Sequence, residues 1–259
     1  EVIEGLNVKP GKKYIDATLA GGGHTLEILN RGGKVLGIDR DQDAIDYVTE
    51  KIKNQKSKIK VGEDLVLVKS NFKDLGEIAK NVGFTKVAGI IFDLGTSRHQ
   101  LKSIGRGFSF QRDELIDMRM DKSEELTARE VINSLSERQL YEIFTKFGEE
   151  KLARTIAHAV LVARTLKPIT TTGELAQIVK TIKKSKEKTD AATKVFQALR
   201  MYVNRELENL RQGLARGVEI LAPGGRIAVI SFHSLEDRVV KNFYRNRENL
   251  GELKVITKK

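Results

Sequence analysis

A glycine loop between two short apolar stretches constrains this chain most. Residues 16–24 are Asp-Ala-Thr-Leu-Ala-Gly-Gly-Gly-His, and residues 35–40 are Val-Leu-Gly-Ile-Asp-Arg. The pattern predicts a strand, a glycine turn, a helix and a second strand that ends at Asp39. In an open α/β sheet such a loop holds a nucleoside cofactor, and the acid accepts hydrogen bonds from its ribose. We therefore expect a cofactor-dependent enzyme; the alternative is that the glycines only form a mobile turn.

Details of the loop favour one kind of cofactor. A dinucleotide loop needs a third glycine for close helix packing, and that position is Leu26 here. Three consecutive glycines, Gly21, Gly22 and Gly23, suit a ligand that lies against bare backbone and carries a carboxylate in place of phosphates. S-adenosylmethionine fits this description. A nicotinamide-dependent oxidoreductase is the alternative enzyme, which Leu26 disfavours.

The composition limits the class of protein. The chain has 259 residues, of which 40% are hydrophobic, enough for one large domain or one domain with an insertion. Its 46 basic and 35 acidic residues give a net charge of +11, which favours a polyanionic partner over a merely soluble basic protein. Because there is no cysteine, we expect no disulfide, no thiolate metal site and a cytoplasmic location. We expect no metal site of any kind and no membrane span, and a first residue other than methionine suggests a short missing N-terminal piece.

The first part of the chain alternates predicted strands and helices. Short apolar runs predict strands at residues 14–19, 34–39, 65–69 and 87–94, with helices at 43–54 and 74–81. Apolar strands separated by helices indicate a parallel sheet that is covered on both faces.

From about Arg112 onward the pattern changes to consecutive helices. Capping-box spacing occurs at Thr127 with Glu130, at Ser136 with Gln139 and at Thr171 with Glu174. A helix over residues 149–166, with Leu152 on its apolar side, lies between the last two. These helices predict a small all-α bundle inserted into the sheet domain.

The remainder returns to the sheet. We expect a long helix over residues 193–221, a strand at 226–232, a helix at 235–245 and a last strand at 253–257. The predicted domains are residues 1–110 and 196–259 for the two parts of the sheet domain, and residues 111–195 for a helical insert that recognises the substrate.

Polar residues follow the fourth predicted strand, at residues 93–100. Loops at the carboxyl ends of parallel strands face the cofactor pocket. An exocyclic amine is a poor nucleophile, and acceptors that bind its protons and fix its geometry raise its reactivity. Asp93 and Ser97 are therefore candidate catalytic residues for modifying a nucleobase, although Asp93 has the alternative role of capping the next turn.

Two further clusters carry candidate contacts. Arginine and phenylalanine interleaved with glycine at residues 105–112 suit phosphate contacts and base stacking. We expect Arg98, Arg106, Phe108 and Arg112 to contact RNA, with the alternative that the phenylalanines are core residues. His233, after the later strand, is a candidate to bind the substrate base or relay a proton. Ser234 and Asp237 also have helix-cap spacing.

These motifs together resemble the bacterial RsmH (MraW) family. The resemblance rests on residues 16–24, 93–100, 106–110, 117–121, 196–200 and 231–238, which occur in the family's order. It implies a class I S-adenosylmethionine-dependent methyltransferase fold, Rossmann-like and mostly parallel, with an inserted helical domain. It also implies methylation of the N4 amine of a cytidine near the decoding centre of small-subunit (16S) ribosomal RNA. The cofactor-binding residues it implies are Gly22, Gly23, His24, Asp39, Phe72, Asp93 and Gln100.

The chain departs from the family in three places, one of which is Asp190-Ala191-Ala192-Thr193, where the family has His-Pro-Ala-Thr. Thr96-Ser97-Arg98-His99-Gln100 stands where the family has Val-Ser-Ser-Pro-Gln. A ribosome-assembly factor that has lost turnover is therefore the non-enzymatic alternative. The family's arginine-rich C-terminal segment does not follow Lys259, and we expect an exposed sheet edge near residues 253–257. The expected partner is free ribosomal RNA or the assembled small subunit, bound by a monomer or a homodimer.

Overall fold

A computed structural model describes residues 1–54, 59–97, 100–101, 103–183 and 190–257. The chain divides into two compact units, the first of Glu1–Ser97 with Leu207–Lys259 and the second of Arg98–Glu206. The second unit is thus longer at both ends than residues 111–195. The physical reason is packing, because Phe108 and Phe196 both lie in the hydrophobic core of the helical unit.

The first unit contains a five-stranded sheet in the order β3-β2-β1-β4-β5. Every neighbouring pair of strands is parallel. The strands are β1 (Lys13–Asp16), β2 (Lys34–Asp39), β3 (Leu65–Lys69), β4 (Val87–Asp93) and β5 (Leu221–Ile230). The expected parallel sheet and its first four strands are therefore confirmed, with shifts of a few residues at the ends.

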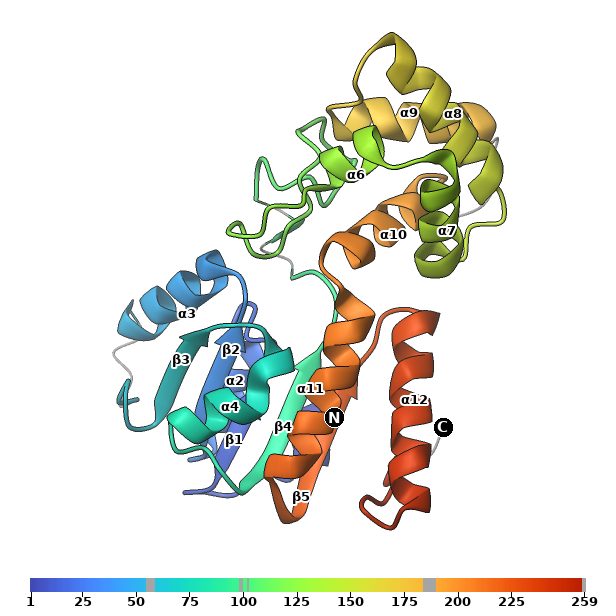
Figure 1. Cartoon of the computed structure of the whole chain (residues 1–259). Helices are drawn as coiled ribbons and strands as arrows, with labels where there is room; N and C mark the ends of the chain where they lie inside the picture. Colours follow the sequence, from blue (N-terminus) through green and yellow to red (C-terminus); the bar gives the residue numbers. More distant parts are fainter. Residues whose placement is uncertain (55–58, 98–99, 102, 184–189, 258–259) are drawn as a thin grey trace. The chain divides into compact units, whose positions relative to one another are not determined.

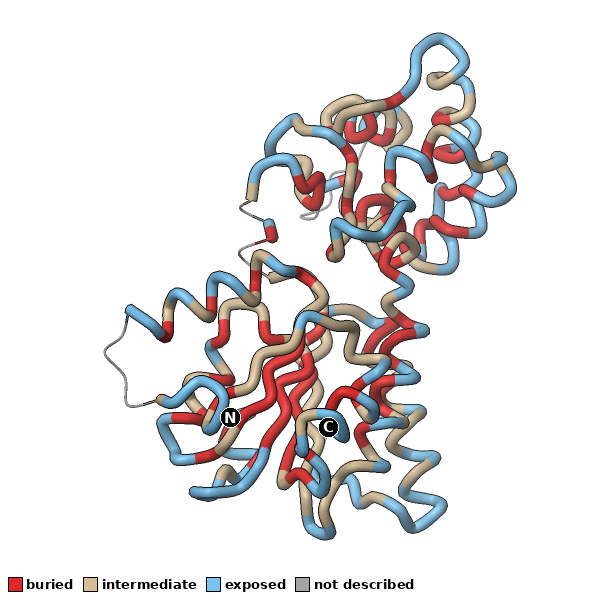
Figure 2. Tube along the Cα trace, turned by 60° about the vertical axis from the view of Figure 1, so that its left-hand side comes forward, coloured by how far each residue is buried: buried red, intermediate tan, exposed pale blue. Residues whose placement is uncertain are grey.

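Helices cover both faces of this sheet (Figure 1). One face packs against α1 (Val2–Leu6), α2 (Gly23–Asn30) and α3 (Gln42–Asn54). The other packs against α4 (Leu75–Asn81), α11 (Glu206–Ile220) and α12 (Ser234–Asn249). Side chains alternate between the faces along each strand, so Tyr14 joins the first core and Ile15 the second. Figure 2 shows the buried strands between these layers.

The second unit is helical. Its helices are α6 (Ala128–Ser134), α7 (Glu137–Gly148), α8 (Ala153–Leu166), α9 (Thr172–Ile182) and α10 (Thr193–Val203). All three predicted capping boxes form, at the starts of α6, α7 and α9. The expected all-α bundle is confirmed, except that Leu152 precedes α8 and is 40% exposed.

The predicted helix over residues 193–221 is wrong, because it is two helices. Asn204 ends α10, and Arg205 has φ 49°, which breaks the helical path. The amide of Asn204 donates to Met118 O at 2.7 Å, and its Oδ1 accepts from Met120 N at 2.8 Å. Asn204 thus provides hydrogen-bond partners for backbone groups of a loop that is more than 80 residues away in the sequence.

The predicted strand at residues 253–257 is also wrong. This segment is not in the sheet, and Val255 N donates to Glu248 Oε1 of α12 at 2.9 Å. Within the described ranges, β5 has only β4 as a neighbour, so the open edge belongs to β5 and not to residues 253–257. Among the helices that the structure describes, none has the length and apolar character to cross a membrane.

Candidate functional site

Three strands of the first unit end in aspartates at one edge of the sheet. Asp16 ends β1, Asp39 ends β2 and Asp93 ends β4. The strands are parallel and in register, so their carboxyl ends lie side by side. Ligands of open α/β sheets bind at this edge.

The glycine loop connects β1 to α2 at the same edge. Gly22 is the N-cap of α2 with φ 69°, and a Cβ there would lie 2.8 Å from Val48. Gly22 is therefore required by backbone conformation and by packing. A Cβ on Gly23 would meet nothing within 4 Å, and one on Gly21 would only reach Tyr47 at 4.0 Å. These two glycines leave open space above the loop.

Asp39 is held by the backbone at the end of β2. Its Oδ2 accepts from Ala20 N at 2.8 Å, and its Oδ1 accepts from Asp41 N at 2.9 Å. Burial raises the pKa of Asp39 to about 6, against these two hydrogen bonds, which lower it. Because Ala20 precedes the glycines, Asp39 also fixes the start of the loop.

Asp16 organises the other side of the loop. It is 1% exposed, and its carboxylate accepts from Thr25 Oγ1 at 2.7 Å and from Thr18 N at 3.3 Å. Burial raises the pKa of Asp16, while Thr25 and His24 oppose the shift. The role of Asp16 is to hold the loop, since its carboxylate is enclosed by protein.

Asp93 is the third acid of this edge, and 31% of its side chain is exposed. Its backbone N donates to Thr18 Oγ1 at 2.6 Å, and its Oδ2 lies 3.7 Å from His24 Nδ1. Its Oδ1 is buried and has no hydrogen-bond partner among the described residues. Burial raises the pKa of Asp93, His24 opposes the shift, and the negative charge of Glu236 adds to it.

His233 and Glu236 follow β5 and complete this group. Glu236 is 2% exposed and accepts from Phe232 N at 3.0 Å. His233 Nε2 lies 3.1 Å from Glu236 Oε1, an ion-pair distance without hydrogen-bond geometry. His233 is itself the N-cap of α12, accepting from Glu236 N at 3.4 Å, so the predicted Ser234 and Asp237 cap is wrong.

Sequence reasoning missed two residues of this site. Thr18 and Glu236 bond to the loops that carry Asp93 and His233. An acid one turn into a helix that follows a strand is a signal for Glu236, but nothing in the sequence separates it from Asp237.

The other expected cofactor residues are placed as follows. Phe72 lies in the short helix η1 (Phe72–Asp74) after β3 and packs edge-on against Phe92 with ring centroids 5.6 Å apart. Ser97 is half-buried at the end of the first unit. Gln100 is buried and belongs to the second unit.

The residues expected to contact RNA differ in exposure. Arg106 is 4% exposed, and its guanidinium donates to Arg119 O at 3.0 Å and Met120 O at 3.1 Å. Phe108 is buried in the core of the helical unit, and the Arg106 guanidinium lies 5.6 Å from its ring centre. Both side chains therefore support the loop and do not offer a surface to RNA, which corrects that expectation. Arg112 is exposed, and Arg98 lies outside the described residues.

This edge fits a nucleoside cofactor with a positively charged centre. The glycines leave a bare backbone cradle, Asp39 offers carboxylate oxygens for hydroxyl groups, and the orphaned Oδ1 of Asp93 is ready to accept a proton donor. A parallel sheet in the order β3-β2-β1-β4-β5 with this loop after β1 is a class I methyltransferase fold.

Comparison with known proteins gives the particular family. The chain belongs to the MraW methylase family, whose model matches residues 1–258. It is 44% identical to the ribosomal RNA small subunit methyltransferase H of Carboxydothermus hydrogenoformans, over 100% of this chain and 87% of that protein. Proteins of the same name from Persephonella marina (44%; 98% and 85% of the two chains) and Desulforapulum autotrophicum (46%; 96% and 80%) are also similar.

Solved structures add little. The cyclopropane synthase MmaA2 from Mycobacterium tuberculosis is 12% identical over 79% of this chain and 75% of that chain, with a TM-score of 0.29. The fold assignment therefore rests on the sheet and the family match.

Proposed function

We propose that this protein is an S-adenosylmethionine-dependent methyltransferase that methylates the N4 amine of a cytidine in small-subunit ribosomal RNA, near the decoding centre. The family match and the names of three relatives support ribosomal RNA as substrate. One observation carries the chemistry: Asp93 Oδ1 is buried and without a hydrogen-bond partner among the described residues, at the edge where the glycine loop is open.

The cofactor, when bound, supplies an electrophilic methyl group on a sulfonium. The open backbone at Gly21 and Gly23 gives it space, and Asp39 accepts hydrogen bonds from its ribose. The half-buried carboxylate of Asp93 also contributes negative charge beside this loop, which favours a positively charged ligand. Phe72 is proposed to contact the adenine, and Asp93 and Gln100 to close the pocket, as the resemblance to the family implies.

Asp93 acts on the nucleobase. Its free Oδ1 accepts a hydrogen bond from the N4 amine, which orients the nitrogen lone pair toward the methyl group and stabilises the charge that grows on nitrogen. The raised pKa makes Asp93 a better proton acceptor than an exposed aspartate. His233 and Ser97 are proposed helpers in binding the base.

RNA binding involves both the base and the backbone. A cytidine must leave its stack to reach the edge of the sheet. The net charge of +11 supplies attraction for phosphates, and exposed Arg112 is a candidate contact in the helical unit. This substrate also places the proposed activity in the cytoplasm, whether the enzyme acts as a monomer or as a homodimer.

The test measures methyl transfer and cofactor binding together. Wild-type protein, Asp93→Ala and Asp93→Asn are given radiolabelled S-adenosylmethionine and small subunits that lack the modification. Both variants are expected to lose methyl incorporation about 100-fold or more, by analogy with the loss of one hydrogen-bond donor that stabilises a transition state. Glu219→Gln is the control, because Glu219 is an exposed carboxylate of α11 that pairs with Arg216. Mass mapping of the labelled RNA identifies the nucleotide.

Three results would overturn the proposal. Wild-type protein that does not bind S-adenosylmethionine in calorimetry contradicts the cofactor. Binding without methyl incorporation favours an assembly factor that lacks turnover. Binding of NADH in a fluorescence titration, with no binding of S-adenosylmethionine, favours an oxidoreductase.

A further inference from the structure

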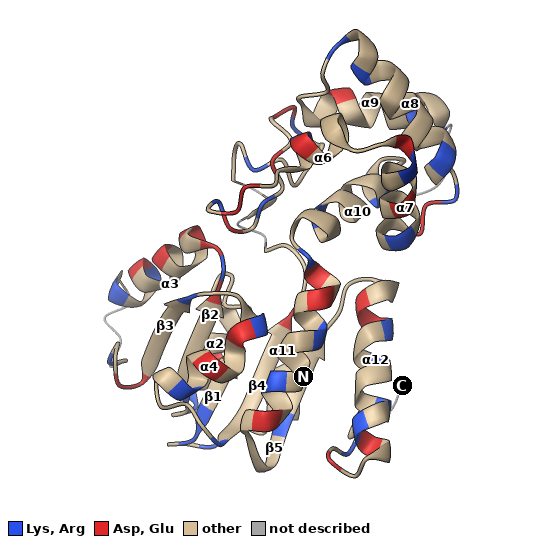
Figure 3. Ribbon diagram, in the orientation of Figure 1, with Lys and Arg blue, Asp and Glu red and all other residues tan. Residues whose placement is uncertain are grey.

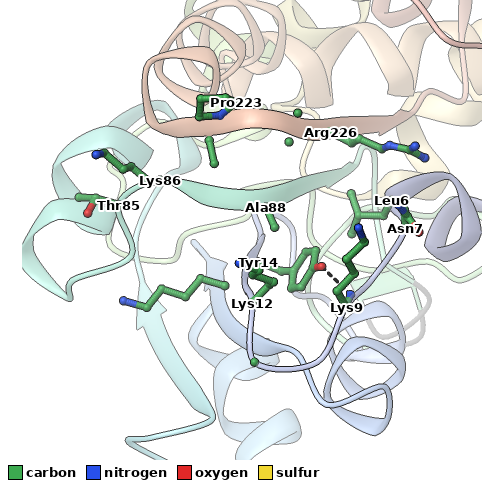
Figure 4. Close-up of a pocket in the computed structure, with 15 residues that line it drawn as sticks. Leu6, Asn7, Lys9, Lys12, Tyr14, Thr85, Lys86, Ala88, Pro223 and Arg226 are labelled. Carbon is green, nitrogen blue, oxygen red and sulfur yellow. Dashed lines mark hydrogen bonds between the residues drawn. The ribbon is translucent and has the colours of Figure 1, made fainter.

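A second pocket lies at the opposite edge of the sheet, where the strands begin. It has a volume of about 460 Å³ and is formed by the segments that lead into β1 and β4 together with the first half of β5 (Figure 4). Its charged lining residues are Lys9, Lys12, Lys13, Lys86 and Arg226. None of the residues that line the pocket belongs to the site at the carboxyl ends of the strands.

The charge of the pocket has one sign. Four lysines and one arginine line it, and no aspartate or glutamate is among the described lining residues. Figure 3 shows basic residues at the ends of β1 and β5 from which these strands start. Five cations around one concave space repel one another unless an anion enters it.

Two of the five cations serve the fold. Lys13 Nζ donates to Gly83 O at 2.7 Å and lies 5.5 Å from the ring centre of Phe84. Arg226 Nη1 donates to Gly5 O at 2.7 Å. These two side chains tie the starts of β1 and β5 to neighbouring segments and form fixed walls.

The other three cations are available to a ligand. The ammonium groups of Lys9, Lys12 and Lys86 make no hydrogen bond or ion pair with the described residues, and all three side chains are exposed. In Figure 4 the side chains of Thr85 and Lys86 lie beside each other at the start of β4.

Lys86 carries a second signal. Its backbone has φ 54°, the left-handed conformation that glycine adopts more readily. A lysine in this conformation costs stability of order 1 kcal/mol relative to glycine. No hydrogen bond or ion pair of the Lys86 ammonium group with the described residues offsets this cost, which is consistent with a use for that group in binding a ligand.

We propose that this pocket binds phosphate groups of the RNA substrate, as a backbone contact on the side of the sheet away from methyl transfer. Lysine is a point-like cation that suits phosphate, and three free ammonium groups match a run of adjacent phosphates. That the bound RNA is small-subunit ribosomal RNA rests on the proposed function. That the pocket binds phosphate rests on the pocket alone. A free phosphorylated small molecule shares this chemistry, and the test separates the two.

The experiment compares two triple variants that lose the same charge. The pocket variant is Lys9→Gln, Lys12→Gln and Lys86→Gln. The control variant is Lys53→Gln, Lys80→Gln and Lys254→Gln, which removes three exposed lysines that lie outside the pocket. Binding of a fluorescent small-subunit RNA fragment is measured by anisotropy from 50 to 300 mM salt. S-adenosylmethionine binding and thermal unfolding are measured on every protein.

The pocket variant is expected to bind RNA about tenfold or more weakly, and its slope of log K against log salt falls by about two to three. The control variant is expected to keep most of the wild-type slope. Lys86→Gly separates binding from folding, because it should unfold at a higher temperature yet bind RNA more weakly. An unchanged RNA affinity for Lys86→Gly overturns the role of that residue.

Other outcomes contradict the proposal as a whole. Equal affinities and slopes for the two triple variants overturn the RNA contact. Inorganic triphosphate is titrated into each protein by calorimetry. If the wild-type protein and the control variant bind it, the pocket variant does not, and RNA binding is the same for all three, the pocket binds a small phosphorylated ligand and the RNA proposal is overturned. If wild-type protein methylates small subunits while the two triple variants behave alike, only the pocket proposal fails. If wild-type protein neither methylates nor binds RNA, both proposals fail.

Discussion

Burial gives the three aspartates at the carboxyl edge different tasks. Asp16 is enclosed and bonded to Thr25, Asp39 is fixed by two backbone N–H groups, and Asp93 keeps one buried oxygen without a partner. Only Asp93 combines a raised pKa with a free acceptor. The structure thus supports separate roles for carboxylates that the sequence presents as similar strand ends.

Asp39 gives a prediction about pH. Its pKa of about 6 lies above the ordinary 3.8, so the ionised form dominates only above pH 6. Hydroxyl groups of a bound ribose favour the ionised carboxylate, so the affinity for S-adenosylmethionine should rise with pH up to about 7 and then level off. At pH 5 about one tenth of Asp39 is ionised, and we expect about tenfold weaker binding than at pH 8.

Calorimetry between pH 5 and pH 8 checks this prediction, with Asp39→Asn as the comparison. The variant should bind weakly and lose most of the pH dependence. Without ligand, stability changes with pH in the opposite direction. Because the pKa of Asp39 is higher in the folded than in the unfolded protein, its contribution to the free energy of unfolding increases as pH falls from above 6 toward 3.8. An affinity that is the same at pH 5 and pH 8 contradicts the role of Asp39.

Gly22 and Gly23 predict opposite effects of the same substitution. Gly22→Ala forces a Cβ to 2.8 Å from Val48 at φ 69°, and should destabilise the fold by about 1–3 kcal/mol. Gly23→Ala meets no protein atom within 4 Å, and alanine is the better helix former. Gly23→Ala should therefore keep or raise the unfolding temperature but weaken S-adenosylmethionine binding at least tenfold, because its Cβ enters the ligand space. Unchanged affinity would show that the ligand does not lie against the loop.

For single residues of the site, the sequence predicts those that end strands and the glycines of the loop, but few of the residues that hold them in place. Asp39 and Asp93 are identifiable because each follows an apolar run, and the open glycines because three occur together. Thr18 and Glu236 are not identifiable from the sequence. Thr18 accepts a hydrogen bond from the backbone N–H of Asp93, which is distant in sequence, and Glu236 accepts one from the backbone N–H of Phe232, which a turn brings close. Arg106 and Phe108 resemble an RNA-binding surface in sequence but are buried, because the loop folds around them.

Elements that begin with local signals were predicted well, and α9 offers a test. Thr171 Oγ1 accepts from Glu174 N at 3.3 Å, and Glu174 accepts in return from Thr171 N at 3.1 Å. Thr171→Ala should cost about 1 kcal/mol in the free energy of unfolding measured in urea. The control is Thr181→Ala in the same helix, where the exposed hydroxyl only bonds to Ile178 O and little change is expected. Equal effects of the two substitutions would contradict the capping argument.

The connection between β5 and α12 gives a second prediction for an element. Glu236 accepts from Phe232 N and lies beside His233, with 2% exposure. Glu236→Ala removes the acceptor of the part-buried Phe232 N–H and should lower the free energy of unfolding by about 0.5–1.5 kcal/mol. Glu236→Gln keeps an acceptor of the same length and should cost less. Urea unfolding checks the order, and an alanine variant as stable as the glutamine variant would refute it.

Elements that depend on distant contacts were predicted poorly. Residues 193–221 have continuous helical character, but Asn204 turns its side chain to Met118 and Met120, and the helix breaks there. Residues 253–257 have the alternating apolar and polar pattern of a strand, yet the backbone N–H of Val255 in this segment donates a hydrogen bond to Glu248 near the end of α12. Neither interaction can be predicted from the local sequence pattern.

At the scale of the whole molecule, three hydrophobic cores define two units, with two cores on the faces of the sheet and one in the helical unit. The cores of the sheet unit and the core of the helical unit share no buried residue among those described. The alternation of predicted strands and then of helices was enough to anticipate both kinds of unit. The ends of the helical unit were not predictable, because Phe108 and Phe196 join its core only through tertiary packing.

Separate cores predict separate responses to a cofactor that binds at the carboxyl edge of the sheet. A ligand at about 100 times its Kd stabilises the unit that binds it by about 2.7 kcal/mol, which slows amide exchange through global opening about 100-fold. Hydrogen exchange with and without S-adenosylmethionine should therefore show strong protection in β1, β2 and β4. The amides of α7 and α8, whose side chains pack in the other core, should exchange at unchanged rates. Gly23→Ala serves as the control, because it should lose the protection while keeping the fold. Equal protection of α7 and β4 would contradict this prediction, since it would mean that the two units open as one.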